Sequence, residues 1–231
     1  SVINGDHQIA AAAVDDVFHF APMKMEGEFL TVANQKELLS IGLRISFLIV
    51  EVAVTEGEDQ KTGFSEIAAE IGADAIAKSF YNAFDLPVTI VRPFNTYGPR
   101  QSARAIIPTI ISQIANGAKE IKVGDLTPTR DFNYVKDTCR GFLAIAKAEN
   151  VAGEEINIAT DTEISMQDTL NLIAEIMGAD VNWVKDPERC RPSKSEVFRL
   201  HGSNEKICRL TDWRPQYSIR EGLKQTIEWF T

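Results

Sequence analysis

Hydrophobic and polar positions along the chain follow two different periods. Short apolar runs rich in β-branched and aromatic residues predict buried strands at residues 14–21, 44–54, 86–92, 120–123 and 155–159. Apolar residues spaced three and four positions apart predict helices at residues 31–41, 65–84, 105–116, 134–148, 165–177, 204–210 and 219–230. Strands that alternate with helices are typical of parallel βαβ units, so the pattern predicts a layered α/β fold.

Two of the predicted helices carry further local signals. The helix at 165–177 starts with Ser165 as its N-cap and has Asp168 three residues later, which resembles a capping box. The helix at 65–84 has one apolar face at i, i+4 spacing, formed by Ile67, Ile71, Ala75 and Ser79. That face packs either within one subunit or against a second subunit, and the spacing is compatible with both.

Composition and charge are those of an ordinary soluble globular protein. Hydrophobic residues make up 44% of the 231 residues and charged residues 25%. The net charge of −9 and the pI of about 4.9 give no basic surface, so we expect no binding to bulk nucleic acid. A local cationic pocket for a small anion is compatible with this charge, because the mean charge does not describe a single cleft.

We expect no membrane span, signal peptide or metal site. The longest apolar run, residues 45–50, is far shorter than the ~20 residues that a spanning helix needs. No basic segment followed by an apolar segment opens the chain. The three cysteines, Cys139, Cys190 and Cys208, lack metal-ligand spacing and predict reduced thiols in a cytoplasmic protein.

The loop that follows the predicted strand at 86–92 is the first candidate for a binding site. Pro93 ends the strand, and a polar loop closed by Gly98-Pro99 follows. In an open α/β sheet, ligands bind beyond the carboxyl ends of the strands. Asn95 could present both a donor and an acceptor there. Taken alone, the segment is equally compatible with a plain exit from a strand into a turn.

This loop resembles the loop after the sixth strand in the extended short-chain dehydrogenase/reductase family of NAD-dependent nucleotide-sugar epimerases and dehydratases. In that family the asparagine side chain contacts the sugar nucleotide. Further elements of the family follow in the same order over roughly residues 71 to 230: Ile107-Pro108 with Gly124-Asp125, the run 130–137, Asn157, the arginine-rich segment 189–196 and Trp213-Arg214-Pro215.

The resemblance implies a fold and a division of the chain. We expect a Rossmann-like parallel sheet with helices on both faces and a small C-terminal substrate-binding lobe. Residues 1–95 are expected to form a partial cofactor domain, and residues 96–231 mainly the substrate-binding lobe, interleaved with elements that return to the sheet. The N-terminal βαβ unit of the family, with its glycine-rich loop, is not found in the sequence.

The resemblance also implies the substrate contacts. A diphosphate is best bound by planar, permanently charged guanidinium groups, and Arg130 and Arg191 are the candidates, with Arg189 a weaker one. Asn95 would contact the sugar nucleotide. Ile107 resembles part of the nucleobase pocket, and both Ile107 and Phe132 suit either a nucleobase face or the core.

The remaining expectations concern the cofactor and one turn. The cofactor contacts would be Asp6, Phe20, Ala21 and Pro93, with NAD favoured over NADP. Tyr134 and Asp137 are expected to fix the turn into the helix at 134–148.

The catalytic Tyr-x-x-x-Lys pair of the family is not present. Counting back from Ile71, the expected tyrosine and lysine positions hold Glu66 and Glu70. A carboxylate at Glu70 would repel the tyrosinate that a lysine stabilises. The two glutamates could form an acid/base pair, but exposed helix positions are the favoured interpretation. The catalytic residues are therefore not assigned.

Three explanations of this gap remain open. The sequence, which begins at Ser1, is an incomplete record of an active enzyme, a truncated homologue that binds a nucleotide sugar without redox chemistry, or an interaction module without a sugar ligand. We favour the first, because the N-terminal half matches the motifs of the family only in part, whereas the C-terminal half matches them closely. Asn95, Arg130 and Arg191 argue against the third.

The resemblance thus implies an NAD-dependent 4,6-dehydratase of a UDP- or GDP-linked hexose, which we expect to be cytoplasmic and homodimeric. A nucleotide-sugar 4-epimerase and a non-catalytic nucleotide-sugar-binding homologue are the alternatives. In the family, dimers form through the helix that corresponds to residues 65–84. The ligand partner would be a nucleoside-diphosphate sugar.

Overall fold

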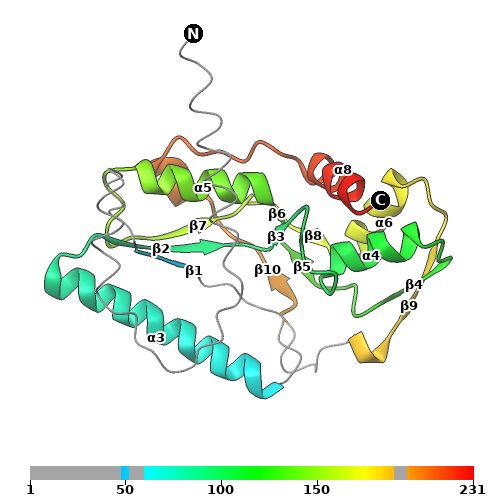
Figure 1. The fold of residues 1–231 in the computed structure, drawn as a ribbon, viewed down its shortest axis with the longest axis horizontal. Helices are drawn as coiled ribbons and strands as arrows, with labels where there is room; N and C mark the ends of the chain where they lie inside the picture. The colour runs from blue at the N-terminus through cyan, green and yellow to red at the C-terminus, as the bar shows by residue number, and fades with distance from the viewer. Residues whose placement is uncertain (1–47, 52–59, 190–196) are drawn as a thin grey trace, which may run out of the picture. The chain divides into compact units, whose positions relative to one another are not determined.

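The computed structural model describes residues 48–51, 60–189 and 197–231, with the backbone alone for 48–51 and 60–70 (Figure 1). All of them belong to one compact unit, Ser46–Thr231. The strand expected at 14–21 and the helix expected at 31–41 lie outside the described residues.

Three strands among the described residues form a parallel sheet. Its strands are β1 (Leu48–Glu51), β2 (Val88–Pro93) and β7 (Glu155–Ile158), in the order β1-β2-β7. Both pairings are parallel. The three strands therefore end at the same edge of the sheet, which is where Asn95 follows β2.

Two helices cover opposite faces of this sheet. Figure 1 shows α3 (Gln60–Phe84) on one face and α5 (Val135–Lys147) on the other. The alternation of side chains along β2 explains this, because Val88 and Ile90 pack with Ala77 of α3 whereas Val91 packs with Ile145 of α5. The predicted arrangement of helices on both faces is confirmed for this sheet.

The long helix α3 starts five residues earlier than the predicted start at residue 65. Its first turns include Gly63, and a single glycine inside a helix costs only about 1 kcal/mol relative to alanine. The helix ends at Phe84, and Asp85 follows with a positive φ of 51°. A residue in this left-handed conformation is a common helix end.

A second layer carries the largest hydrophobic core. It is formed by α4 (Ile106–Ala115), α6 (Met166–Ile176), α8 (Ile219–Phe230) and the parallel pair β4 (Glu120–Val123) and β9 (Asn182–Lys185). Its fully buried members include Ile107, Ile110, Ile111, Ile121 and Ile173. The predicted bounds of β4 and α8 agree with the structure, because both elements have a clear hydrophobic period.

Short strand pairs join the sheet to this layer. β3 (Thr96–Tyr97) pairs with β6 (Asn133–Tyr134), and β5 (Thr129–Arg130) lies between β10 (Arg199–Leu200) and β8 (Ile164–Ser165). The sequence did not predict these pairs or β9, since a strand of two residues has no detectable period. The connections also include η3 (Pro187–Arg189) and α7 (Glu205–Leu210).

The boundary expected at residue 95 remains a prediction. β7 and α5 both follow that position in the chain, and both complete the layer built on β1 and β2. In the part of the chain that the structure describes, no helix is both long enough and apolar enough to cross a membrane.

Candidate functional site

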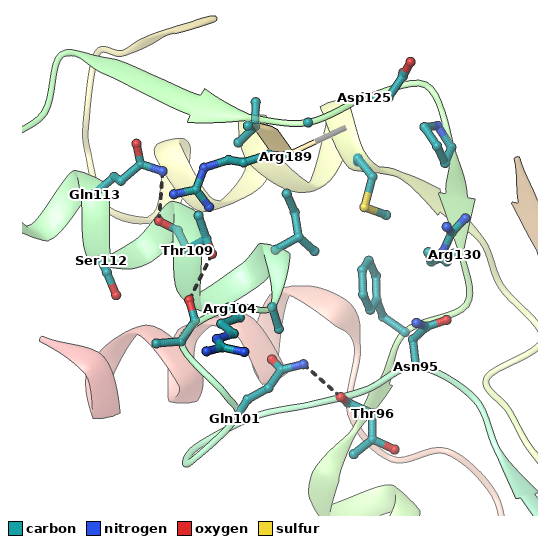
Figure 2. Close-up of a pocket in the computed structure, with 18 residues that line it drawn as sticks. Asn95, Thr96, Gln101, Arg104, Thr109, Ser112, Gln113, Asp125, Arg130 and Arg189 are labelled. Carbon is teal, nitrogen blue, oxygen red and sulfur yellow. Dashed lines mark hydrogen bonds between the residues drawn. The ribbon is translucent and has the colours of Figure 1, made fainter. Parts of the chain in front are cut away.

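A cavity of about 620 Å³ opens beside the N-terminal end of α4 (Figure 2). Six segments contribute to it: the exit of β2, the loop before α4 together with α4 itself, the exit of β4, the segment from Pro128 to Phe132, the start of α6 at Met166, and η3. The polar and charged lining residues include Asn95, Gln101, Arg104, Asp125, Arg130 and Arg189. A cavity of this size suits a small-molecule ligand.

The lining of the cavity is cationic although the chain is acidic. Arg104, Arg130 and Arg189 reach it from different sides (Figure 2), whereas Asp125 is the one acidic residue among the described residues that line it. Guanidinium groups are the donors best matched to phosphate oxygens. The cavity is therefore an electrostatically favourable place for an anion.

Helix α4 adds to this attraction for anions. Its N-cap residue, Ala105, makes no side-chain hydrogen bond to the first turn, and both Ala105 and Ile106 line the cavity. The first amide groups of a helix lack partners inside the helix and carry the positive end of its dipole. A phosphate next to these amides would be stabilised.

Two amide side chains that line the cavity carry unsatisfied acceptors. The Oδ1 atom of Asn95 and the Oε1 atom of Gln101 are buried and have no hydrogen-bond partner among the described residues. The Nε2 atom of Gln101 donates to the carbonyl oxygen of Thr96 at 3.1 Å, which orients its amide (Figure 2). Buried acceptors without partners are costly, and a ligand that offers O–H or N–H donors would remove that cost.

Arg130 is held in place by backbone groups. Its Nη1 atom donates to the carbonyl oxygen of Thr129 at 2.9 Å and to that of Val197 at 2.6 Å. β5 presents this side chain to the cavity, and Phe132, two residues further on, lines the same cavity. Phe132 is 8% exposed and also packs edge-on against Tyr97, so it belongs both to the cavity wall and to the core.

The exit of β4 is fixed by Asp125. Its carboxylate accepts hydrogen bonds from the backbone N–H of Thr127 at 2.9 Å and the Thr127 hydroxyl at 2.7 Å, and pairs with Lys185 at 2.9 Å. These bonds, the Thr127 backbone donor first, lower the pKa of Asp125 to about 2. Asp125 therefore stays ionised at neutral pH and acts mainly as a structural acceptor.

Arg189 is placed by the contact of η3 with β4. Its Nε atom lies 3.4 Å from a carboxylate oxygen of Asp186. Gly124 leaves room for the Arg189 backbone, because a Cβ at position 124 would overlap the Arg189 carbonyl oxygen. The weaker sequence candidate for the diphosphate thus lies in the same cavity as Arg130.

One of the expected substrate contacts lies in the core. Ile107 is fully buried in the core and does not line the cavity. Its neighbour Ile106 does, because consecutive helix residues point about 100° apart and the core takes the side of α4 that carries Ile107. We therefore move the proposed apolar contact from Ile107 to Ile106.

Several other expected residues lie away from the cavity or outside the described chain. Pro93 ends β2 and does not line the cavity. The structure does not describe the other expected residues, which are Asp6, Phe20, Ala21, Arg191 and the side chains of Glu66 and Glu70.

Tyr134 and Asp137 have structural partners. The Tyr134 hydroxyl donates to Gln225, and the Asp137 carboxylate accepts from the backbone N–H groups of Gln216 and Tyr217. Both residues therefore hold the C-terminal segment against α5.

Gln101 and Arg104 were missed by the sequence interpretation. Both lie in the loop between Gly98-Pro99 and α4, the segment that directly follows the loop of Asn95. Their closeness to Asn95 in sequence was the available signal. Among the described residues, no group of three His, Cys, Asp or Glu side chains could hold a metal ion.

Comparison with known proteins gives consistent matches. The family model described as GDP-mannose 4,6 dehydratase matches residues 67–226. The human dTDP-D-glucose 4,6-dehydratase is 33% identical over 169 residues, which cover 71% of this chain and 47% of that protein. The chain spans about half the length of the curated relatives that it matches.

Solved structures share the fold. Epimerase Mth375 from Methanothermobacter thermautotrophicus has a TM-score of 0.68 and 25% identity, covering 85% of this chain and 66% of that one. DesIV, a dTDP-glucose 4,6-dehydratase from Streptomyces venezuelae with NAD and TYD bound, has a TM-score of 0.63 and 25% identity, covering 80% and 59%. The expected Rossmann-like α/β fold is confirmed by these likenesses.

Proposed function

Because the chain belongs to the GDP-mannose 4,6 dehydratase family, as its motifs led us to expect, we propose that the cavity beside α4 binds a nucleoside-diphosphate sugar. The observation that carries this proposal is the convergence of Arg104, Arg130 and Arg189 on one cavity in an acidic protein. A diphosphate has the charge and the oxygen geometry that this group of donors fits.

The remaining lining suits the uncharged parts of such a ligand. Sugar hydroxyl groups can donate to the buried acceptors of Asn95 and Gln101. Phe132 and Ile106 offer an aromatic and an apolar surface for a nucleobase. The diphosphate would lie next to the N-terminal amides of α4.

We further propose that the reaction is a 4,6-dehydration assisted by NAD. The family model, the human relative and DesIV support this choice, since all three bear that activity in their names, whereas Mth375 is named an epimerase. A nicotinamide cofactor would accept hydride from C4 of the sugar. Among the four proposed cofactor contacts, the structure describes Pro93, which lies at the end of β2. We propose NAD rather than NADP as this cofactor.

One observation favours a second candidate function. Glu66 and Glu70 occupy the positions where the resemblance places tyrosine and lysine. A chain with carboxylates there can bind a nucleotide sugar without exchanging hydride, because neither glutamate replaces the lysine cation. A non-catalytic binding homologue is therefore the alternative, with a 4-epimerase as the other enzymatic one.

Calorimetric titration with UDP, GDP and dTDP tests the binding proposal. At least one of them should bind, and Arg130→Ala should weaken that binding by about 1.5–3 kcal/mol, the range of a lost charge-assisted hydrogen bond. Arg220→Ala is the matched control, because Arg220 pairs with Glu175 and does not line the cavity. Absence of binding to all three nucleotides would refute the proposal.

Incubation with sugar nucleotides and NAD tests the reaction. Mass spectrometry should detect a product that has lost one water from a UDP-, GDP- or dTDP-linked hexose. Inversion at C4 without a change of mass would favour the epimerase. Binding without any turnover would favour the non-catalytic homologue.

We also propose that α3 forms a homodimer contact. Ile71, Ile76, Phe80 and Phe84 on this helix are 65%, 62%, 47% and 71% exposed. Ile76, Phe80 and Phe84 follow one another at four-residue spacing and therefore share one face of α3, and an exposed apolar face of this kind is typical of an interface. Phe80→Glu should shift the protein to the monomer in analytical ultracentrifugation, and an unchanged sedimentation coefficient would contradict this contact.

A further inference from the structure

A buried carboxylate lies between the two cavity residues Arg130 and Phe132. Asp131 is 0% exposed. Its Oδ1 atom accepts hydrogen bonds from the backbone N–H of Thr160 at 2.9 Å and from the Thr160 hydroxyl at 2.6 Å. Its Oδ2 atom accepts from the backbone N–H of Asp161 at 3.0 Å and from that of Gly202 at 3.4 Å. Both oxygens therefore have two donors each.

These donors come from two separate parts of the chain. Thr160 and Asp161 follow the end of β7 at the carboxyl edge of the sheet, and Gly202 follows β10. The backbone N–H of Asp131 donates to the carbonyl oxygen of Leu200 in β10 at 2.8 Å. Asp131 thus joins the sheet edge, β10 and the segment that carries Arg130.

The loop after β7 adopts a conformation that needs such support. Asp161 has a positive φ of 58°, which is uncommon for a residue other than glycine. Its N–H is the group that donates to the Oδ2 atom of Asp131. The bond to Asp131 therefore helps to hold this strained turn at the sheet edge.

We propose that Asp131 is a positioning residue that fixes Arg130 and Phe132 relative to Asn95 for binding of the diphosphate ligand. This inference rests on the proposed function of the cavity. The side chain of Asp131 is buried on the far side of the segment from the cavity, so it acts through its neighbours and makes no contact with the ligand. Asn95 belongs to the same unit, because its carbonyl oxygen accepts from the backbone N–H of Asn133 at 2.9 Å.

The two acceptor oxygens of Asp131 matter more than its size. Asparagine has the same shape, but its NH₂ group would face a backbone N–H whichever way the amide is turned: that of Thr160 on one side, those of Asp161 and Gly202 on the other. At least one backbone donor would lose its acceptor and meet a second donor. Asp131→Asn therefore weakens the hydrogen bonds that connect this segment to the loop after β7 and to β10, while the side chain fills the same volume.

Asp137 provides a matched control six residues further along. It is also 0% exposed and accepts from the backbone N–H groups of Gln216 and Tyr217, both at 3.0 Å. Arg140 donates to it at 2.5 Å. Because Asp137 holds the C-terminal segment and does not line the cavity, Asp137→Asn should reduce stability without affecting Arg130.

The first experiment measures the preference for a diphosphate over a monophosphate. Titrations of the whole chain with UDP and UMP, GDP and GMP, and dTDP and dTMP give this ratio of affinities. Asp131→Asn should lower the ratio about tenfold, corresponding to roughly 1.4 kcal/mol. Asp137→Asn should leave it unchanged. An unchanged ratio in Asp131→Asn, or an equal fall in Asp137→Asn, would overturn the proposal.

The second experiment separates this inference from the proposed function. Nuclear magnetic resonance relaxation of the Arg130 Nε–H group, assigned by its loss in Arg130→Lys, reports its order without any ligand. The order should fall in Asp131→Asn and not in Asp137→Asn. If no nucleotide binds to the wild type, the proposed function and the ligand part of the inference fail, and this measurement still decides whether Asp131 positions Arg130.

A milder substitution covers the case in which Asp131→Asn does not fold. Thr160→Val removes the hydroxyl donor to Oδ1 and leaves the three backbone donors in place. It should lower the affinity ratio and the order of Arg130 in the same direction by a smaller amount. Wild-type values for both would count against the proposal.

Discussion

Gly124 lies directly against the backbone carbonyl of Arg189, so that a Cβ at position 124 would overlap the carbonyl oxygen. This contact brings η3 onto the exit of β4 and places the Arg189 side chain at the cavity. The glycine is thus required by the close approach of two backbone segments, and the approach determines where one cation of the candidate site lies.

Gly124→Ala should therefore push η3 away from β4. Overpacking of this kind costs about 1–3 kcal/mol, which urea denaturation would measure. Gly72→Ala is the control, since nothing among the described residues lies within 4 Å of a Cβ there. In the interior of α3, that change should raise stability by roughly 0.5–1 kcal/mol. Equal stabilities of Gly124→Ala and the wild type would show that the two segments are not held together.

Ser218 should contribute to the stability of α8. Its hydroxyl accepts from the backbone N–H of Glu221, and the Glu221 carboxylate accepts from the backbone N–H of Ser218 at 2.9 Å, which forms a complete capping box. Ser218→Ala should lower the free energy of unfolding by about 1 kcal/mol. Ser218→Asp retains an acceptor and should remain close to the wild type. A neutral effect of alanine in thermal denaturation would disprove the role of this cap.

The stability of the protein should fall in acid partly through Asp125. The folded-state pKa of Asp125 is about 2, below the ordinary value of about 3.9, because Thr127 and Lys185 favour the ionised form. A lowered pKa stabilises the fold above about pH 4, and this stabilisation is lost as pH falls toward 2. The difference in unfolding free energy between wild type and Asp125→Asn should therefore shrink over this range. A difference that is constant with pH would contradict the assignment.

Cys139 should react slowly with thiol reagents. Burial raises the pKa of its thiol to about 11, so about one molecule in a thousand carries the thiolate at pH 8. Cys139 and Cys208 are both free thiols. In a Cys190→Ser variant, the Ellman reaction should show a slow phase that Cys139→Ser removes and that denaturant accelerates. Fast labelling of Cys139 in the folded protein would contradict the raised pKa of its thiol.

Much of the fold could be predicted from the sequence, because the hydrophobic period of a helix or strand depends only on residues close together in the chain. The bounds of β4 and α8 were predicted as observed, and Ser165 caps α6 through the backbone N–H of Asp168 at 2.9 Å. These features depend on residues within one or two turns of each other. The short strands and β9, whose four residues are all exposed, have no such local period and were not predicted.

The candidate site was predictable only in part. Asn95, Arg130 and Arg191 were expected to share one cleft; Asn95 and Arg130 line one cavity, and Arg191 lies outside the described residues. Ile107 and Ile106 could not be distinguished by composition, because the core selects one face of α4. The importance of Arg104 and Gln101 depends on the direction in which the loop before α4 runs, which the sequence pattern does not encode.

The sequence alone determined the alternation of strands and helices, the family resemblance and the position of Asn95 after a strand, since each is a pattern of neighbouring residues. The tertiary structure decided which arginines share a cavity and what Asp131 holds. The bonds of Asp131 join it to residues 29, 30 and 71 positions away, and contacts over such separations form only when the chain folds. Long-range packing therefore selected the members of the site from a larger set of plausible residues.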